Sequence, residues 1–178
     1  GFFLRSTKRN STAFFFIVAA LVLSWAGDVL LQMKGMFIPG LISFLLAHIF
    51  YIIYFIRRNS RRKGLLQIHP FIGIPVLLYI LVFLWLLFPY LDVLKIPVTV
   101  YGITIGTMLL ASINMRRKTN DVAATYFITG ALLFVVSDSL LAVNLFAYSS
   151  ILLSLFVMLT YASAQYLIVK GALHDEVE

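Results

Sequence analysis

The sequence predicts an all-α polytopic transmembrane helix bundle, on three observations. Of the 178 residues, 62% are hydrophobic and 12% are charged, and the mean hydropathy is +1.00, whereas soluble domains are about half apolar and about a quarter charged. Six apolar segments are each long enough to cross a bilayer core as a helix, which takes about 20 residues. The loops between them are short, so residues 1–178 are expected to form a single membrane domain.

The six helices are expected at residues 13–33, 37–56, 71–89, 94–114, 122–146 and 149–170. Charged, glycine, proline and serine residues mark the turns between them. Pro75 is expected to kink the third helix. Gly102 and Gly106, four residues apart in the fourth helix, are expected to let a neighbouring helix pack closely rather than to bind a ligand. Trp25 and Trp85 are expected on lipid-facing or packing surfaces.

The distribution of Lys and Arg predicts the orientation in the membrane. Of 14 such residues, twelve fall in the N-terminal region, the second and fourth loops and the C-terminal region, and two in the other three loops. The positive-inside rule therefore places both termini in the cytoplasm. The net charge of +7 then lies in cytosolic loops, where it meets anionic lipid headgroups, and it does not indicate nucleic-acid binding.

Two aspartates lie within predicted spans, Asp28 in the first helix and Asp138 in the fifth. Both helices are expected to run outward, which puts each carboxyl about 22–24 Å into a core about 30 Å thick. A carboxylate at such depth costs about 2.5–3.5 kcal/mol, so both are expected to face the bundle interior and to act in function. The alternative is that they cap or bridge helices, or are wetted near the interface.

Four more polar residues lie in inward-running helices, His48 and Tyr51 in the second and Tyr161 and Gln165 in the sixth. Each pair shares a helix face, and all four could line one polar cavity. His48 could equally be a structural residue that bonds to a neighbouring helix or a catalytic residue. The tyrosines are expected to orient partners rather than to react.

The sequence lacks the residues that several classes of reaction and binding site require. There is no cysteine, which excludes disulfides, thiolate metal sites and thiol nucleophiles. Neither G-x-S-x-G nor H-E-x-x-H occurs, and no run of carboxylates has metal-ligand spacing, so serine hydrolases and zinc proteases fit poorly. His69 and His174 fall at the expected cytoplasmic boundary and are expected to be solvated.

The surroundings of the two aspartates indicate an internal repeat. The chain reads GDVLL at residues 27–31 and SDSLL at 137–141, and Tyr51 and Tyr161 each lie 23 residues after their aspartate. The first two helices therefore match the last two at an offset of 110 residues, in the same orientation, as a parallel repeat requires. Four-helix units would make the visible helices six of eight, with two expected before Gly1, where no initiator methionine stands.

Five segments together carry a family resemblance: SWAGDVLL (24–31), FIPGL (37–41), AHIFY (47–51), GALLFVVSDSLLA (130–142) and TYASAQ (160–165). They resemble, in order, the motifs of the YhhN family of lysoplasmalogenases. The resemblance covers roughly residues 13–170. It implies an eight-helix bundle in a membrane, which in a bacterium would be the inner membrane.

The resemblance also implies an activity, hydrolysis of the vinyl ether bond of lysoplasmalogen to a fatty aldehyde and a glycerophospho-headgroup. That reaction needs a positioned proton donor. Two carboxyls that share a buried site favour a state in which one is protonated and the other ionised, so Asp28 and Asp138 are expected to be the acid and its partner. Either could be the acid. His48, Tyr51, Tyr161 and Gln165 are expected to orient them, with no metal or organic cofactor.

Three other classes use similar features. Paired intramembrane carboxylates in a parallel repeat also suit a proton-coupled transporter or a lipid flippase, although the helices have few internal Gly or Pro breaks. An intramembrane aspartyl protease would use the same pair on peptide bonds. A membrane scaffold would use it only structurally.

Overall fold

The computed structural model describes residues 11–57 and 62–175. Their long helices are, in chain order, α1 Ser11–Gln32, α2 Phe37–Arg57, α4 Ile74–Leu87, α5 Lys95–Asn114, α6 Asp121–Ala142 and α7 Ile151–Asp175. A four-residue helix, α3 (Leu65–Ile68), precedes α4, and short 3₁₀ turns flank α4 and follow α5. The predicted six-helix, all-α fold is confirmed, and over the described residues no strand interrupts it.

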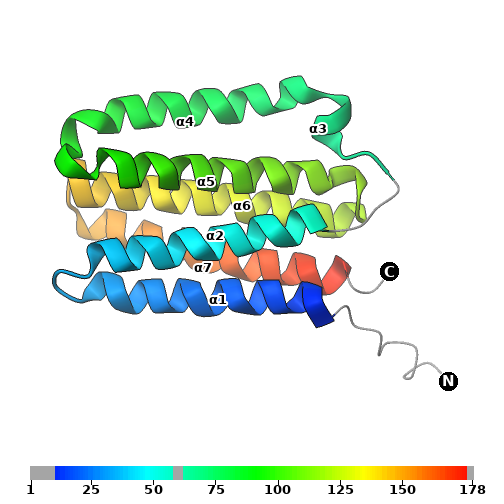
Figure 1. The fold of residues 1–178 in the computed structure, drawn as a ribbon, viewed down its shortest axis with the longest axis horizontal. Helices are drawn as coiled ribbons and strands as arrows, with labels where there is room; N and C mark the ends of the chain where they lie inside the picture. Colours follow the sequence, from blue (N-terminus) through cyan, green and yellow to red (C-terminus); the bar gives the residue numbers. More distant parts are fainter. Residues whose placement is uncertain (1–10, 58–61, 176–178) are drawn as a thin grey trace.

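The six long helices lie side by side and alternate in direction (Figure 1). α1 packs against α2, α2 against α5, α5 against α6 and α6 against α7, while α7 also touches α1. α4 packs on the outside of α5. Because α1 and α6 run the same way, the repeat's requirement of parallel direction is met.

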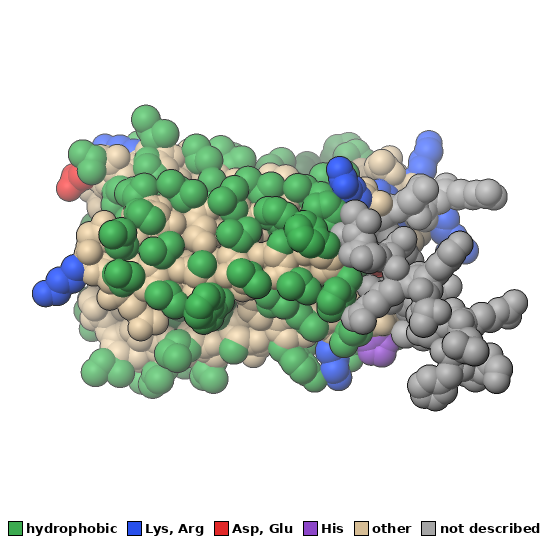
Figure 2. All heavy atoms as spheres, turned by 60° about the horizontal axis from the view of Figure 1, so that its bottom comes forward, with side chains coloured by type: hydrophobic (Ala, Val, Ile, Leu, Met, Phe, Trp, Pro, Cys, Tyr) green, Lys and Arg blue, Asp and Glu red, His purple; other side chains and the backbone are tan. Residues whose placement is uncertain are grey.

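The membrane character of the bundle is visible on its surface. Each of the six helices, with its flanking turns, forms an apolar stretch of 19–27 residues long enough to span a bilayer. Figure 2 shows hydrophobic side chains over the middle of one face, with charged side chains toward its ends. Trp25 and Trp85 are 67% and 74% exposed, as expected for lipid-facing residues. The chain is a multi-pass membrane protein.

One expectation about the third span is wrong. Pro75 does not kink a helix, because it lies in the first turn of α4, where its missing N–H has no intrahelical partner to lose. A 3₁₀ turn, Pro70–Gly73, leads into this start. The fifth span also differs in detail: α6 ends at Ala142 and continues as a π-helical turn, Val143–Ala147.

Small residues set how closely the helices approach. A Cβ at Gly106 would lie 3.0 Å from Ile80, and one at Gly102 would lie 3.2 Å from Leu84. The expectation that these glycines admit a neighbouring helix is confirmed, and that helix is α4. Gly130 of α6 faces α7 more tightly still, because an added Cβ would lie 2.7 Å from the side chain of Ile168 and 3.0 Å from the backbone oxygen of Ala164.

A group of hydrogen bonds holds the C-terminal end of α7. Asp175 is buried and accepts hydrogen bonds from Tyr54 of α2, at 3.1 Å, and from Thr119 in the α5–α6 loop. Asn120 caps α6 through the backbone N–H of Ala123 and also donates to the carbonyl of His174. His69 and His174 are exposed, as expected. These contacts tie three segments together away from the two intramembrane aspartates.

Candidate active site

Asp28 and Asp138 occupy equivalent positions on parallel helices. Each lies four residues before the end of its helix, α1 or α6, in the direction in which both helices run. Neither is fully buried. Each accepts a hydrogen bond from one tyrosine of another helix: Tyr161 of α7 donates to Asp28 at 2.9 Å, and Tyr101 of α5 donates to Asp138.

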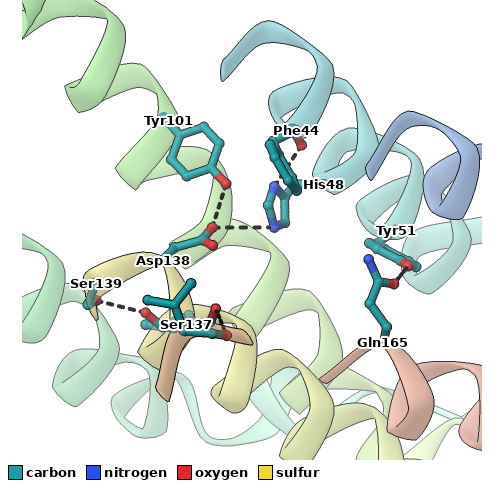
Figure 3. A network of polar contacts seen from close by, with 10 residues as sticks. Phe44, His48, Tyr51, Tyr101, Ser137, Asp138, Ser139 and Gln165 are labelled. Atoms are coloured by element: carbon teal, nitrogen blue, oxygen red, sulfur yellow. Dashed lines mark hydrogen bonds and ion pairs between the residues drawn. The ribbon is translucent and has the colours of Figure 1, made fainter. Parts of the chain in front are cut away.

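Asp138 has a second neighbour on the same oxygen. The Nε2 atom of His48, from α2, lies 3.8 Å from the Oδ2 atom that accepts from Tyr101, and Figure 3 shows the carboxyl facing both residues. The His48 side chain is 1% exposed and that of Asp138 is 12% exposed. Three helices, α2, α5 and α6, therefore converge on one carboxyl oxygen.

The tautomer of His48 follows from its other nitrogen. Nδ1 lies 2.8 Å from the backbone oxygen of Phe44, and a carbonyl oxygen only accepts, so Nδ1 carries a hydrogen. In neutral His48 the Nε2 atom is then an acceptor, and it has no hydrogen-bond partner among the described residues. A lone pair facing a carboxylate oxygen is repulsive unless one proton lies on one of the two atoms. The geometry thus suits a His48–Asp138 pair that holds a single proton.

A buried ring connects the polar groups. Phe134 lies one turn before Asp138 on α6 and is 0% exposed. Its ring centroid lies 5.1 Å from that of His48, 5.6 Å from that of Tyr161 and 6.0 Å from that of Tyr51. His48 and Tyr51 lie on α2 and Tyr161 lies on α7, so Phe134 packs between these two helices and fixes the relative positions of the three rings.

The remaining two candidates bond to each other. The hydroxyl of Tyr51, fully buried on α2, donates to the side-chain oxygen of Gln165 on α7. This bond joins α2 to α7 and lies apart from the carboxyl of Asp138 (Figure 3). Gln165 also interacts with the hydroxyl of Tyr161, which joins this contact to the one between Tyr161 and Asp28. That all four candidates line one polar cavity stays a prediction.

A small cavity of about 40 Å³ lies beside Asp138, between α4, α5 and α6. Three of the side chains that line it are polar, namely Asp138, Tyr101 and Ser139, and the others are apolar apart from Gly102. None of His48, Tyr51, Tyr161 and Gln165 borders it. Sequence reasoning missed Tyr101, although its hydroxyl group in an apolar span was a signal of the same kind as those of Tyr51 and Tyr161.

No group of three or more His, Cys, Asp or Glu side chains within residues 11–57 and 62–175 could hold a metal ion. The chemistry on offer is therefore that of carboxyl, imidazole and phenol groups. A carboxyl group that lies beside an imidazole, a phenol and a small, mostly apolar cavity places the chain in a class, helical membrane proteins with a polar site inside the bundle.

The family itself follows from sequence comparison. The model of the YhhN family matches residues 2–172, and the chain belongs to that family. Its relatives include lysoplasmalogenase TMEM86B of mouse (Mus musculus), 29% identical over 97% of this chain and 70% of its own length, and that of human (Homo sapiens), 32% identical over 89% and 63%. A lysoplasmalogenase of Mycobacterium bovis is 32% identical over 87% of this chain and 59% of its own length.

The chain thus spans about three fifths to seven tenths of the length of these relatives. No solved structure matches it. The family resemblance read from the five sequence segments is confirmed.

Proposed function

We propose that this protein hydrolyses the vinyl ether bond of lysoplasmalogens within the bilayer, giving a fatty aldehyde and a glycerophospho-headgroup. Membership of a family whose curated relatives are named lysoplasmalogenases supports the activity. The observation that carries the proposal is the carboxyl of Asp138, which lies beside His48 and Tyr101 and borders a mostly apolar cavity. Such a site offers a proton to a lipid without first taking the lipid into water.

Asp138 acts as the general acid. Vinyl ethers react when an acid protonates the alkenyl carbon, C2 of the chain, which leaves an oxocarbenium ion at C1. The proton held by the His48–Asp138 pair is transferred from Asp138 to C2. The hydroxyl of Tyr101 donates to the carboxylate that forms and so stabilises it. His48 orients this acid and does not touch the substrate.

Asp28 completes the reaction as the general base. Water adds to C1, and its proton passes through a further water molecule to Asp28, which does not border the cavity and which Tyr161 holds by a 2.9 Å hydrogen bond. The hemiacetal then breaks its bond between C1 and the glycerol oxygen, while its hydroxyl proton passes to that oxygen. One proton leaves Asp138 and one reaches Asp28, so a return of the proton to Asp138 closes the cycle. Neither a metal nor an organic cofactor takes part.

Topology and surroundings follow from the loop charges. Both termini face the cytoplasm, and the basic loops contact anionic headgroups. In a bacterium the membrane is the inner membrane. The Tyr51–Gln165 bond holds α2 against α7 and orients the helices that carry His48 and Tyr161.

The experiment is an aldehyde-release assay on the complete protein in membranes. The substrates are a lysoplasmalogen, the matching ester lysolipid and the matching saturated ether. We expect Asp28→Asn and Asp138→Asn each to lower kcat by about 10²- to 10⁴-fold, the usual contribution of a general acid or base. Asp92→Asn is the matched control, because Asp92 is exposed in a turn outside the site.

Thermal unfolding of each variant in detergent separates lost chemistry from lost fold. Full activity of either site variant would exclude that aspartate from the mechanism. Cleavage of the ester alone would replace the proposed reaction by phospholipase chemistry.

A further inference from the structure

We propose that the cavity between α4, α5 and α6 is the subsite for the vinyl ether group, reached sideways from the bilayer between α4 and α6. This inference rests on the proposed function and adds where the substrate binds and how it enters. Its occupant is the first carbons of the sn-1 chain of a single-chain phospholipid.

The chemistry of the lining suits that occupant. The walls carry aliphatic side chains from all three helices, such as Ile80, Val98 and Ile105. The reactive carboxyl of Asp138 and the hydroxyl of Tyr101 stand among them. An alkenyl chain needs apolar walls and, at one point only, an acid. A charged headgroup would find no Lys, Arg or His side chain in this lining.

The size of the cavity selects how much of the chain is held. A volume of about 40 Å³ accommodates roughly three water-sized groups, since one such group needs about 10–15 Å³. The two alkenyl carbons and the ether oxygen are three heavy atoms. The rest of the chain must then lie outside the cavity. The site is therefore selective for the vinyl ether linkage and has little selectivity for the length of the chain.

The route in is set by how α4 is attached. α4 packs closely on α5, where Gly102 and Gly106 admit Leu84 and Ile80. Over the described residues α4 does not pack in the same way on α6. The hydrogen bond between the hydroxyls of Tyr79 and Ser139, at 2.8 Å, joins these two helices.

The outer face of α4 is turned to lipid, with Leu81 64% exposed and Trp85 74% exposed. The α4–α6 side is therefore the side on which a chain already dissolved in the bilayer meets the cavity.

A photolabelling experiment tests the subsite without requiring turnover. The probe is a saturated, non-hydrolysable ether lysolipid with a diazirine at the third chain carbon, and a second probe carries the diazirine at the far end of the chain. Each is bound to the full wild-type protein in lipid nanodiscs, and the labelled peptides are identified by mass spectrometry. We expect the first probe to label α4, α5 and α6 around the cavity, and the second to label lipid-facing residues outside it.

A filling variant gives the matching kinetic test. Ala142 borders the cavity, and Ala142→Leu adds three carbons to it. We expect kcat/KM to fall about tenfold or more for lysoplasmalogens of every chain length, in line with the effect of steric misfit in an apolar pocket. The control is Ala162→Leu, the same addition at an exposed position of α7, which we expect to leave kcat/KM unchanged.

The outcomes separate this inference from the proposed function. Labelling of α1 and α7 by the near probe overturns the subsite even where the wild type releases aldehyde. Labelling around the cavity in a protein that releases none supports the subsite and overturns the reaction. An undiminished kcat/KM in a folded Ala142→Leu variant also overturns the subsite.

Discussion

The Nε2 atom of His48 lies 3.8 Å from Oδ2 of Asp138, and the other ring nitrogen of His48 is held by the carbonyl of Phe44. This relationship distinguishes the two aspartates, because Asp28 has a tyrosine partner but no imidazole beside it among the described residues. The distance exceeds that of a hydrogen bond to nitrogen, about 3.2 Å at most. A slight closure on binding substrate would bring the pair into direct contact.

Two substitutions of His48 separate its two nitrogens. The side-chain amide of Asn can replace the Nδ1–H bond to Phe44 and leaves nothing at the position of Nε2, whereas Gln reaches that position. We expect His48→Asn to fold but to lose about 10²-fold in kcat, and His48→Gln to retain more activity. The measurements are kcat, KM and the pH–rate profile of each variant. Equal activity of His48→Asn and wild type would leave His48 a purely structural residue.

Tyr101, which is half-buried, and Tyr51, which is buried, form a pair of tyrosines whose hydroxyls bond to Asp138 and to Gln165, respectively. We expect Tyr101→Phe to lower kcat with little change in stability or KM. Tyr51→Phe should instead lower the free energy of unfolding by about 0.5–1.5 kcal/mol, the net contribution of one hydrogen bond. Steady-state kinetics and denaturation in the same nanodiscs measure both effects. The reverse pattern would argue against the placement of Tyr101 at the acid.

The sequence predicts the framework better than the contacts. Hydropathy and loop charge predicted six helices and their alternation, and the repeat made Asp28 and Asp138 equivalent. The repeat also equates Tyr51 with Tyr161, yet Tyr161 binds an aspartate and Tyr51 binds Gln165. At the 110-residue offset His48 corresponds to Met158, so the two repeat units carry different side chains at this position.

Tyr101 and Phe134 were not predicted, for a physical reason. In a soluble helix the polar face shows which side is buried, but a helix that is apolar all round gives no such signal. Whether Tyr101 faces Asp138 or lipid depends on the rotation of α5 about its own axis. That rotation is set by packing between helices, at glycines such as Gly102 and Gly106.

The absence of cysteine from the chain makes its topology easy to test. Lys118→Cys places one thiol in the α5–α6 loop, and Ser149→Cys places one in the α6–α7 loop. We expect a membrane-impermeant maleimide to label Cys at 149 in intact cells and Cys at 118 only after the membrane is opened, because the basic loops stay inside. Aldehyde release by both variants checks that they remain native. Labelling of 118 in intact cells would invert the proposed orientation.

The fate of the solvent hydrogen tests the reaction itself. If Asp138 delivers its exchangeable proton to C2 of the chain, hydrolysis in D₂O places one deuterium at C2 of the aldehyde. Water labelled with ¹⁸O places its oxygen in the carbonyl group, because the bond that breaks joins C1 to the glycerol oxygen. Reduction of the aldehyde to the alcohol as it forms prevents later exchange at both positions, and mass spectrometry then counts the labels. The control is the authentic unlabelled aldehyde carried through the same incubation and reduction. Aldehyde without deuterium at C2 would rule out protonation of the alkenyl carbon, and with it the role of Asp138 as the acid.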